Sequence, residues 1–148
     1  MMAVSAVALV AIMGLTLDIG RMYVVKNEAQ AYADAGALMA ARQLNGAHGT
    51  SAGILTQSQL LALNPNRYDL GSREFDATNV ALEYAKTEAG PWVPPEAAQS
   101  SASGVNFVRV TANPAAALYF LPIVIPQKSV VVPGMAVACQ APKVRLVE

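Results

Sequence analysis

The chain has 148 residues, of which 54% are hydrophobic and only 14% are charged, and its formal net charge at pH 7 is zero. Disorder needs low hydrophobicity with high net charge, and nucleic-acid binding needs an excess of lysine and arginine, so this composition excludes the first and argues against the second. The single cysteine excludes an internal disulfide framework, a multi-cysteine zinc cluster and an iron–sulfur cluster, and we expect no cofactor, no metal and no small-molecule substrate.

The chain begins inside an apolar run, residues 1–17, that carries no charge. As a helix this run rises about 26 Å, just short of the ~30 Å hydrocarbon core of a bilayer, so it lies at the lower limit for a spanning helix. It lacks the basic start and the cleavage site of a secretory signal peptide. We interpret Met1 as a mature terminus left after removal of a basic leader, and a wrongly assigned start or a shortened sequence is the alternative.

Charged residues then appear without interrupting the helical pattern. Asp18 and Arg21 are three residues apart, a spacing that lets the two charges pair on one face of a helix. No proline occurs between residues 18 and 44, alanine recurs throughout, and Asn45-Gly46 supplies a C-terminal stop signal. The pattern predicts one helix over residues 1–44, roughly 66 Å long.

The second half of this predicted helix carries small residues at four-residue steps. Small side chains let helix backbones approach closely, and packing then supplies the attraction between the helices. We interpret these positions as contacts between subunits. The alternative is that alanine covers the chain's own small sheet, and both can hold at different depths along the helix. The positions are Ala29, Ala33, Ala37 and Ala41, with Gly36 and Ala40 beside them.

Two motifs follow the uncharged run in a fixed order: Asp18-Ile19-Gly20-Arg21-Met22-Tyr23, and then the alanine-rich segment Ala33–Ala41. In this order they resemble the N-terminal region of TadE/TadG-like proteins of the tight-adherence (Flp) pilus system. More loosely, Phe107–Ala112 and the apolar Leu118–Pro122 resemble the C-terminal strand and turn of that family.

The resemblance implies a pilin-like, membrane-inserted subunit that reaches the cell surface after a prepilin-type peptidase cuts it behind a glycine. Pilins usually carry a glutamate at the fifth mature position, which pairs with the terminal amine of a neighbouring subunit, whereas this chain has Ser5 there. A hydroxyl accepts a hydrogen bond from an ammonium group but cannot neutralise its charge. We count Ser5, Gly14, Asp18 and Arg21, with the small residues above, as candidate subunit-packing residues.

Residues 45–148 are expected to form a small head, so the predicted fold class is α+β: a long N-terminal, pilin-like helix with a small antiparallel sheet. Ile54–Leu63 is predicted to be a short helix that ends at Asn64-Pro65-Asn66. Alternation and β-branched residues predict the strands. These strands are Tyr68–Phe75, Val80–Lys86, Val105–Thr111 and Ser129–Ala138.

Turn-forming residues set the details of the head. Asp76–Asn79 fits either a hairpin turn or the N-cap of a helix through Tyr84, and we favour the turn. Pro133 removes a backbone donor, which places the last strand at an edge or a bulge. Proline and serine clusters predict exposed loops at Gly90–Pro95 and Gln99–Gly104.

Single residues of the head give weak functional signals. Cys139 is expected to be a buried structural thiol, with an intersubunit disulfide as the alternative, and His48 is expected in a solvated loop. Trp92 and Tyr119 are expected in head packing or at a surface contact. Three acidic residues lack the ligand pattern of a calcium loop and are expected on a solvated surface; they are Asp69, Glu74 and Asp76.

Two functions follow from these features. The favoured one is a structural subunit of an extracellular pilus-like filament, whose core is built by the N-terminal helices of many copies. The alternative is an inner-membrane-anchored protein that assists pilus assembly, and a tethered periplasmic enzyme is a weak third. The expected partners are other copies of the chain, the inner membrane and the pilus assembly machinery, and the expected location is the cell surface, reached through the inner membrane.

Two predictions for substituted chains follow from the favoured interpretation. Ala33→Leu is expected to reduce polymerisation while the head stays folded. Asp18→Ala is expected to harm assembly more than the double variant Asp18→Ala, Arg21→Ala, because removing one partner of a buried pair strands the other charge.

Overall fold

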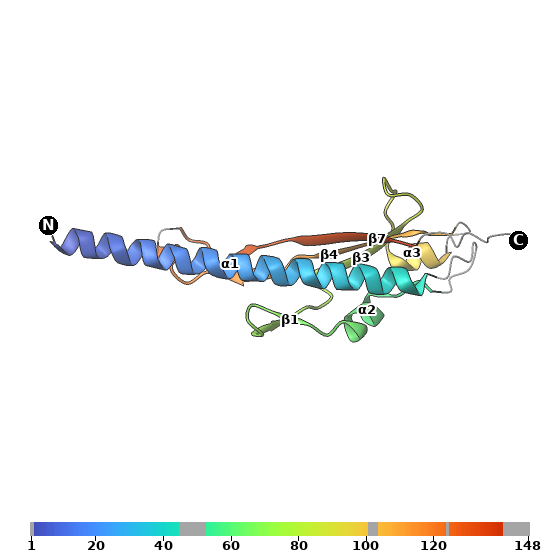
Figure 1. Ribbon diagram of the computed structural model, residues 1–148, viewed down its shortest axis with the longest axis horizontal. Coiled ribbons are helices and arrows are strands. Elements are labelled where there is room, and N and C mark those ends of the chain that lie inside the picture. The colour runs from blue at the N-terminus through green and yellow to red at the C-terminus, as the bar shows by residue number, and fades with distance from the viewer. Residues whose placement is uncertain (1, 45–52, 101–103, 124, 141–148) are drawn as a thin grey trace, which may run out of the picture.

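The computed structural model describes residues 2–44, 53–100, 104–123 and 125–140, and for residues 2–8 and 10 it describes the backbone but not the side chains. Its dominant element is helix α1, Met2–Gln43, which is 42 residues long. At 1.5 Å per residue α1 extends about 63 Å. Its N-terminal part projects from the other elements, and its C-terminal part lies alongside them (Figure 1). The predicted uninterrupted helix is confirmed.

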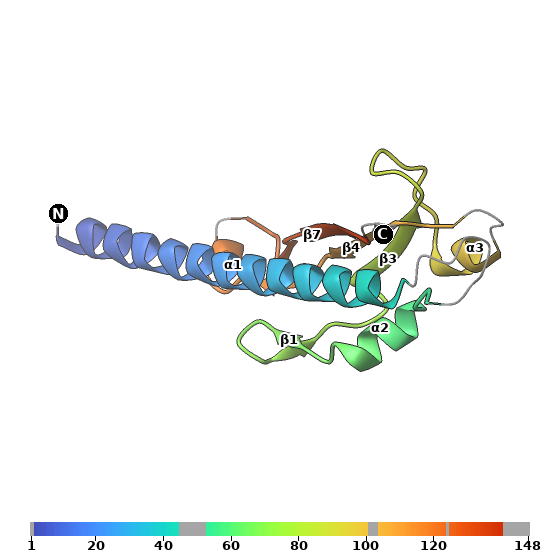
Figure 2. The same cartoon turned by 45° about the vertical axis from the view of Figure 1, so that its right-hand side comes forward.

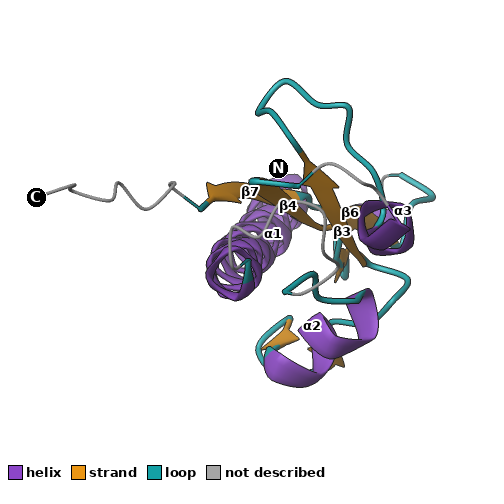
Figure 3. Cartoon of the chain, turned by 90° about the vertical axis from the view of Figure 1, so that its right-hand side faces the viewer, coloured by secondary structure: helices purple, strands orange, loops and turns teal. Residues whose placement is uncertain are grey.

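A three-stranded antiparallel sheet covers the C-terminal part of α1. Its strands are β3 (Val80–Ala85), β4 (Phe107–Ala112) and β7 (Gly134–Cys139), in the order β3-β4-β7. Buried and half-buried residues alternate along β4, because one face of the sheet packs against α1. Figure 3, viewed along the helix, shows α1 on that single face. The α+β class and two of the predicted strands are confirmed, with bounds shifted by one or two residues.

The core lies between α1 and this sheet. Val108 and Val110 of β4 and Leu82 of β3 are at most 2% exposed, and they meet a helix face built mainly of alanine. Because the alanine side chains of this face are so short, the sheet comes very near the helix backbone. A Cβ atom added to Gly134 would lie 2.5 Å from the carbonyl carbon of Ala29.

A second group of elements packs under α1. Helix α2, Gln57–Leu63, begins with a capping box in which the Thr56 side chain accepts from the Gln59 N–H. Next comes a hairpin of two short strands, β1 (Arg67–Tyr68) and β2 (Arg73–Glu74). Figure 2 shows this hairpin beneath α1.

The single strand predicted over Tyr68–Phe75 is therefore wrong. The chain reverses at Asp69-Leu70-Gly71, where all three residues have φ between 56° and 80°. The strand prediction followed the apolar and charged pattern and passed over Asp69 and Gly71, which are turn-forming residues that tolerate positive φ. The chain turns at Asp76–Asn79 as predicted, with the Asp76 carboxylate accepting from the N–H of Thr78 at 2.8 Å, but this is not a hairpin turn, because β2 and β3 lie in different sheets.

The strand predicted over Ser129–Ala138 is divided in two. Strand β6, Ser129–Val131, pairs with β5, Ala115–Ala117, in a separate two-stranded sheet, and β7 begins after Pro133. The predicted effect of Pro133 is confirmed, because the ladder breaks there and β7 is an edge strand. Two short helical segments were not predicted: α3 (Pro95–Ser100) and the 3₁₀ turn η1 (Leu121–Ile123).

The free edge of β7 is partly capped by side chains of α1. The Gln30 side chain donates to the carbonyl of Met135 at 3.0 Å and accepts from its N–H at 3.4 Å, and the Lys26 ammonium donates to the carbonyl of Pro133. Such polar caps discourage a second strand from joining the edge. Cys139, at the end of β7, is exposed, so the prediction of a buried thiol is wrong. His48 lies outside the described residues.

Candidate attachment site at the end of the helix

The projecting part of α1 presents large apolar side chains to solvent. Six of them are between 43% and 66% exposed: Leu9, Ile12, Met13, Leu15, Leu17 and Ile19. At 100° per residue these positions cover an arc of roughly 200° around the helix. Among the described residues, no helix combines the length and the apolarity needed to cross a membrane. The exposed arc nevertheless needs a partner, because soluble chains rarely leave so large an apolar surface bare.

The opposite side of the helix is covered by a loop from far along the sequence. We call it the junction loop, and it comprises residues 119–123 and Ile125. Phe120 lies against Gly14, so closely that a Cβ atom at Gly14 would come within 2.6 Å of the ring. Gly14 therefore permits a contact within the chain, whereas the sequence pointed to a contact between subunits.

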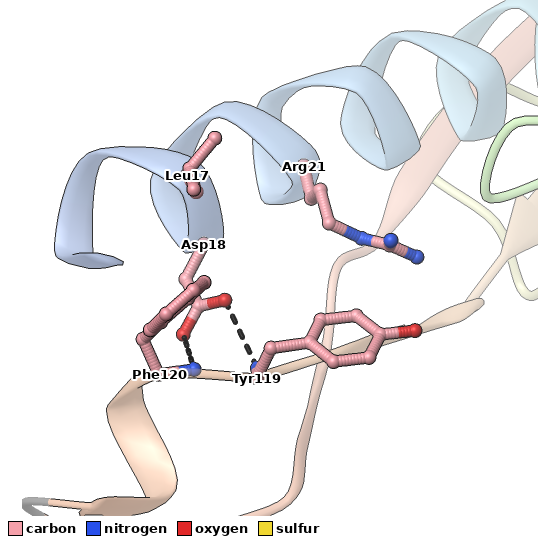
Figure 4. Close-up of a pocket in the computed structure, with 5 residues that line it drawn as sticks. All are labelled: Leu17, Asp18, Arg21, Tyr119 and Phe120. Atoms are coloured by element: carbon pink, nitrogen blue, oxygen red, sulfur yellow. Dashed lines mark hydrogen bonds between the residues drawn. The ribbon is translucent and has the colours of Figure 1, made fainter. Parts of the chain in front are cut away.

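Asp18 fixes the junction loop to the helix. One carboxylate oxygen accepts from the N–H of Tyr119 at 3.0 Å, and the other accepts from the N–H groups of Phe120 and Leu121 at 2.9 and 2.6 Å. Two of these bonds are drawn in Figure 4. The residue is 0% exposed, and its described hydrogen-bond donors are these backbone N–H groups of the loop. A shallow hollow of about 260 Å³ remains beside it, lined by Leu17, Asp18, Arg21, Tyr119 and Phe120.

Arg21 has a different partner from the one predicted. Its guanidinium forms an ion pair with Asp69, in the turn between β1 and β2, and lies over the ring of Tyr119 at 4.6 Å. Asp69 is 3% exposed, and its backbone N–H donates to the carboxylate of Glu28 at 2.7 Å, which fixes the turn to α1 at a second point. The predicted direct pair of Asp18 with Arg21 is therefore wrong: each charge reaches a separate segment of the head. The expected solvated position of Asp69 is also wrong.

Electrostatics at Asp18 favour the ionised form. Burial alone would raise the pKa of Asp18, but the hydrogen bonds from Leu121, Tyr119 and Phe120, with the nearby charge of Arg21, hold the pKa below its ordinary value of 3.8. The folded chain thus binds fewer protons at this site than the unfolded chain does. The stability that Asp18 contributes is complete above the ordinary pKa and is lost as the pH falls through the lower folded pKa.

The loss of this stability at low pH can be measured. Between about pH 5 and pH 3, the Tm of the wild-type chain should fall more than that of Asp18→Asn, which has no carboxylate to protonate at this position. Asp76, whose pKa is lowered by hydrogen bonds from Thr78 and Asn79, serves as the control. Asp76→Asn should keep the part of the pH dependence that belongs to Asp18. Identical acid profiles for the wild type and Asp18→Asn would contradict the assignment.

The small residues of α1 face the chain's own sheet. Ala29, Ala33, Gly36, Ala37, Ala40 and Ala41 are all buried, with exposed fractions from 0% to 6% for the five alanines. A residue without exposed surface has nothing to offer to a neighbouring subunit in this conformation. The structure therefore shows packing within one chain, the second interpretation of the ladder, and the contact between subunits stays a prediction. Ser5 belongs to α1, but its side chain lies outside the described ones.

Two further residues of the head have clear neighbours. Trp92 lies under the guanidinium of Arg109 at 4.4 Å, and Arg109 pairs with Glu83 at 2.7 Å. These contacts fit the expected role of Trp92 in head packing. Tyr119 is 59% exposed and packs only its ring face against Arg21, which makes it a surface contact.

Sequence reasoning missed the role of the junction loop. The only available signal was an apolar stretch, Leu118–Ile125, that is broken by Pro122 and so fits neither a helix nor a strand. An apolar stretch outside regular elements indicates a surface that some partner covers.

Residues 1–43 match the family model described as "Putative Flp pilus-assembly TadE/G-like". The match covers the segment that carries the two motifs, so the resemblance is confirmed over these residues. No curated protein and no solved structure matches the chain.

Proposed function

We propose that this chain is a component of Flp-type pilus assembly that is attached to the cell envelope by the N-terminal part of α1 and presents its head at a fixed position beside that attachment. The family match over residues 1–43 supports a part in the Flp pilus. The main observation in favour of this attachment is the exposed apolar arc from Leu9 to Ile19. At the C-terminal end of the arc, the first charged residue, Asp18, is buried against the junction loop.

Rigid coupling between helix and head supports an anchoring role. Asp18 holds the junction loop and Arg21 holds the β1–β2 turn, so two separate contacts join the head to one helical turn. Beyond them, the helix contributes its alanine face to the core. A head joined in this way keeps a defined orientation to whatever surface holds the helix.

The filament subunit remains the second candidate. Its main support in the sequence was the small-residue ladder, and that ladder is buried within the chain. One observation still favours it: the apolar arc from Leu9 to Ile19 has the width expected of a helix that neighbouring helices surround.

Cell fractionation tests the proposal. Cells that make Flp pili are sheared to release surface filaments, and their membranes are washed in alkaline carbonate. The chain should remain in the washed membranes, and its deletion should reduce the number of filaments. Recovery of the chain as the principal protein of the sheared filaments would contradict anchoring and support the second candidate.

A matched pair of variants locates the attachment. Ile12→Lys with Leu15→Lys places two charges on the apolar arc, and each lysine opposes burial in hydrocarbon, at a cost that reaches about 3 kcal/mol at a bilayer centre and falls toward the interface. This variant should lose its retention in membranes. Leu38→Lys alters a residue that is 61% exposed but lies in the part of α1 beside the head, and it should be retained like the wild type. Equal retention of both variants would exclude the arc as the attachment surface.

A further inference from the structure

The junction loop gathers large, exposed apolar side chains in a short segment outside α1. Ile123 is 82% exposed, Tyr119 59%, Phe120 38% and Ile125 37%. No charged residue occurs between Arg109 and Lys128, so the loop and both of its flanks are neutral. Apolar side chains gathered in this way at one end of a head indicate a contact surface.

The position of the loop beside α1 makes the apolar surface continuous. The loop is fixed at Asp18 and reaches Gly14, four residues nearer the N-terminus, which is about 6 Å along the helix. There it covers the helix face that the apolar arc leaves free. At the level of Gly14 to Asp18, the loop therefore continues the apolar surface of the helix on the side that the arc leaves free, and Figure 4 shows Phe120 and Tyr119 of the loop beside Asp18. The exposed hydroxyl of Thr16 at this level donates to the carbonyl of Met13 at 2.7 Å.

The charged residue that follows the loop in the chain is a cation. Lys128 is exposed, and its carbonyl accepts from the N–H of Leu118 at 2.9 Å, which places it at the base of the loop. The carboxylates of Asp18 and Asp69 are withdrawn from solvent, with exposed fractions of 0% and 3%, and the guanidinium of Arg21 is paired with Asp69. A cation at the rim of an apolar surface suits the phosphates of lipid headgroups. The N-terminal run of a second copy carries no charge and could not pair with it.

We infer that the junction loop is a second membrane contact: Ile123 and its neighbours enter the boundary between headgroups and acyl chains of an anionic bilayer, beside the helix, while Lys128 lies at the lipid phosphates. This inference rests on the proposed attachment of α1. A depth of about 5–10 Å is usual for interfacial apolar surfaces, and the ~6 Å reach of the loop agrees with it. The loop then sets how deeply the helix sits and on which side the head stands.

Site-directed fluorescence tests the inference on the full chain. In a Cys139→Ser background, which removes the native thiol, Ile123→Cys is labelled with the environment-sensitive dye NBD. The protein is reconstituted at a high lipid-to-protein ratio into vesicles of phosphatidylethanolamine and phosphatidylglycerol. We expect a blue-shifted emission that is quenched by brominated acyl chains and protected from aqueous iodide. The matched control, Leu38→Cys in the same background, should show the opposite pattern.

The outcomes separate the inference from the proposed function. If the protein stays with the vesicles but the dye at position 123 remains open to iodide, the loop contact is wrong and the anchoring helix stands. The dye could also be protected from iodide without being quenched by the brominated lipids, and this protection could be lost when the protein is diluted. That result would show that a second copy covers the loop, and it would overturn the inference. A chain that does not associate with the vesicles would overturn both proposals.

Discussion

Replacing Gly134 by valine should lower the free energy of unfolding by about 3 kcal/mol or more, because Gly134 is buried and has no room for a side chain. The first added carbon would lie 2.5 Å from the carbonyl carbon and 2.6 Å from the carbonyl oxygen of Ala29. Because both are backbone atoms of α1, no side-chain rotation relieves the overlap. The sheet must move away from the helix, and the alanine face loses its packing.

Thermal unfolding followed by circular dichroism in mild detergent measures this effect. Gly20→Ala is the matched control, because nothing lies within 4 Å of a Cβ atom at Gly20 and alanine is the stronger helix former by up to about 1 kcal/mol. This control should be neutral or slightly more stable than the wild type. Equal stability of Gly134→Val and the wild type would mean that β7 does not approach Ala29 as the structure shows.

The packing of the sheet on the alanine face also changes the result expected for Ala33→Leu. From the sequence alone, a leucine there should have blocked polymerisation and left the head folded. In the structure Ala33 is 0% exposed beneath the sheet, so a larger side chain overfills the chain's own core and should destabilise the head by about 1–3 kcal/mol. Any loss of assembly in this variant would then follow from unfolding.

Local sequence patterns were sufficient for the elements that local physics determines. Helix α1 has no proline and is rich in alanine, and β4 alternates strictly, so both follow from propensity and periodicity. Other elements depend on tertiary contacts. Strand β5 is three alanines that pair only because β6 lies beside them, and the β1–β2 turn requires positive φ at Asp69 and Leu70.

The candidate site shows the limit of a sequence more sharply. The sequence identified Asp18 and Arg21 as important but paired them with each other, since residues three apart are neighbours on a helix. Their actual partners lie 101 to 103 and 48 positions away. The partners of Asp18 are backbone N–H groups, which every residue except proline possesses, so no pattern of side chains predicts them.

Asp18→Ala should release the junction loop from α1. The substitution removes the acceptor of three backbone N–H groups at once, and those of Tyr119, Phe120 and Leu121 then have no protein partner at the helix. We expect hydrogen exchange of these three amides to accelerate on the order of tenfold or more, with a Tm lower by several degrees. Amides of β4 should keep their protection, because the core does not depend on the loop. Asp18→Asn, which retains one acceptor, should be intermediate.

Comparison with Arg21→Ala decides between the two pairings. If Asp18 and Arg21 neutralised each other, the double variant would be less damaged than either single variant, since no stranded charge would remain. With separate partners, the losses should accumulate instead: Asp18→Ala frees the loop, Arg21→Ala leaves the carboxylate of Asp69 without its main cation, and the double variant suffers both. The exchange rates of the loop amides and the Tm values of the four chains measure this. A double variant more stable than either single variant would support the direct pair and contradict the assignment of Asp18 to the junction loop.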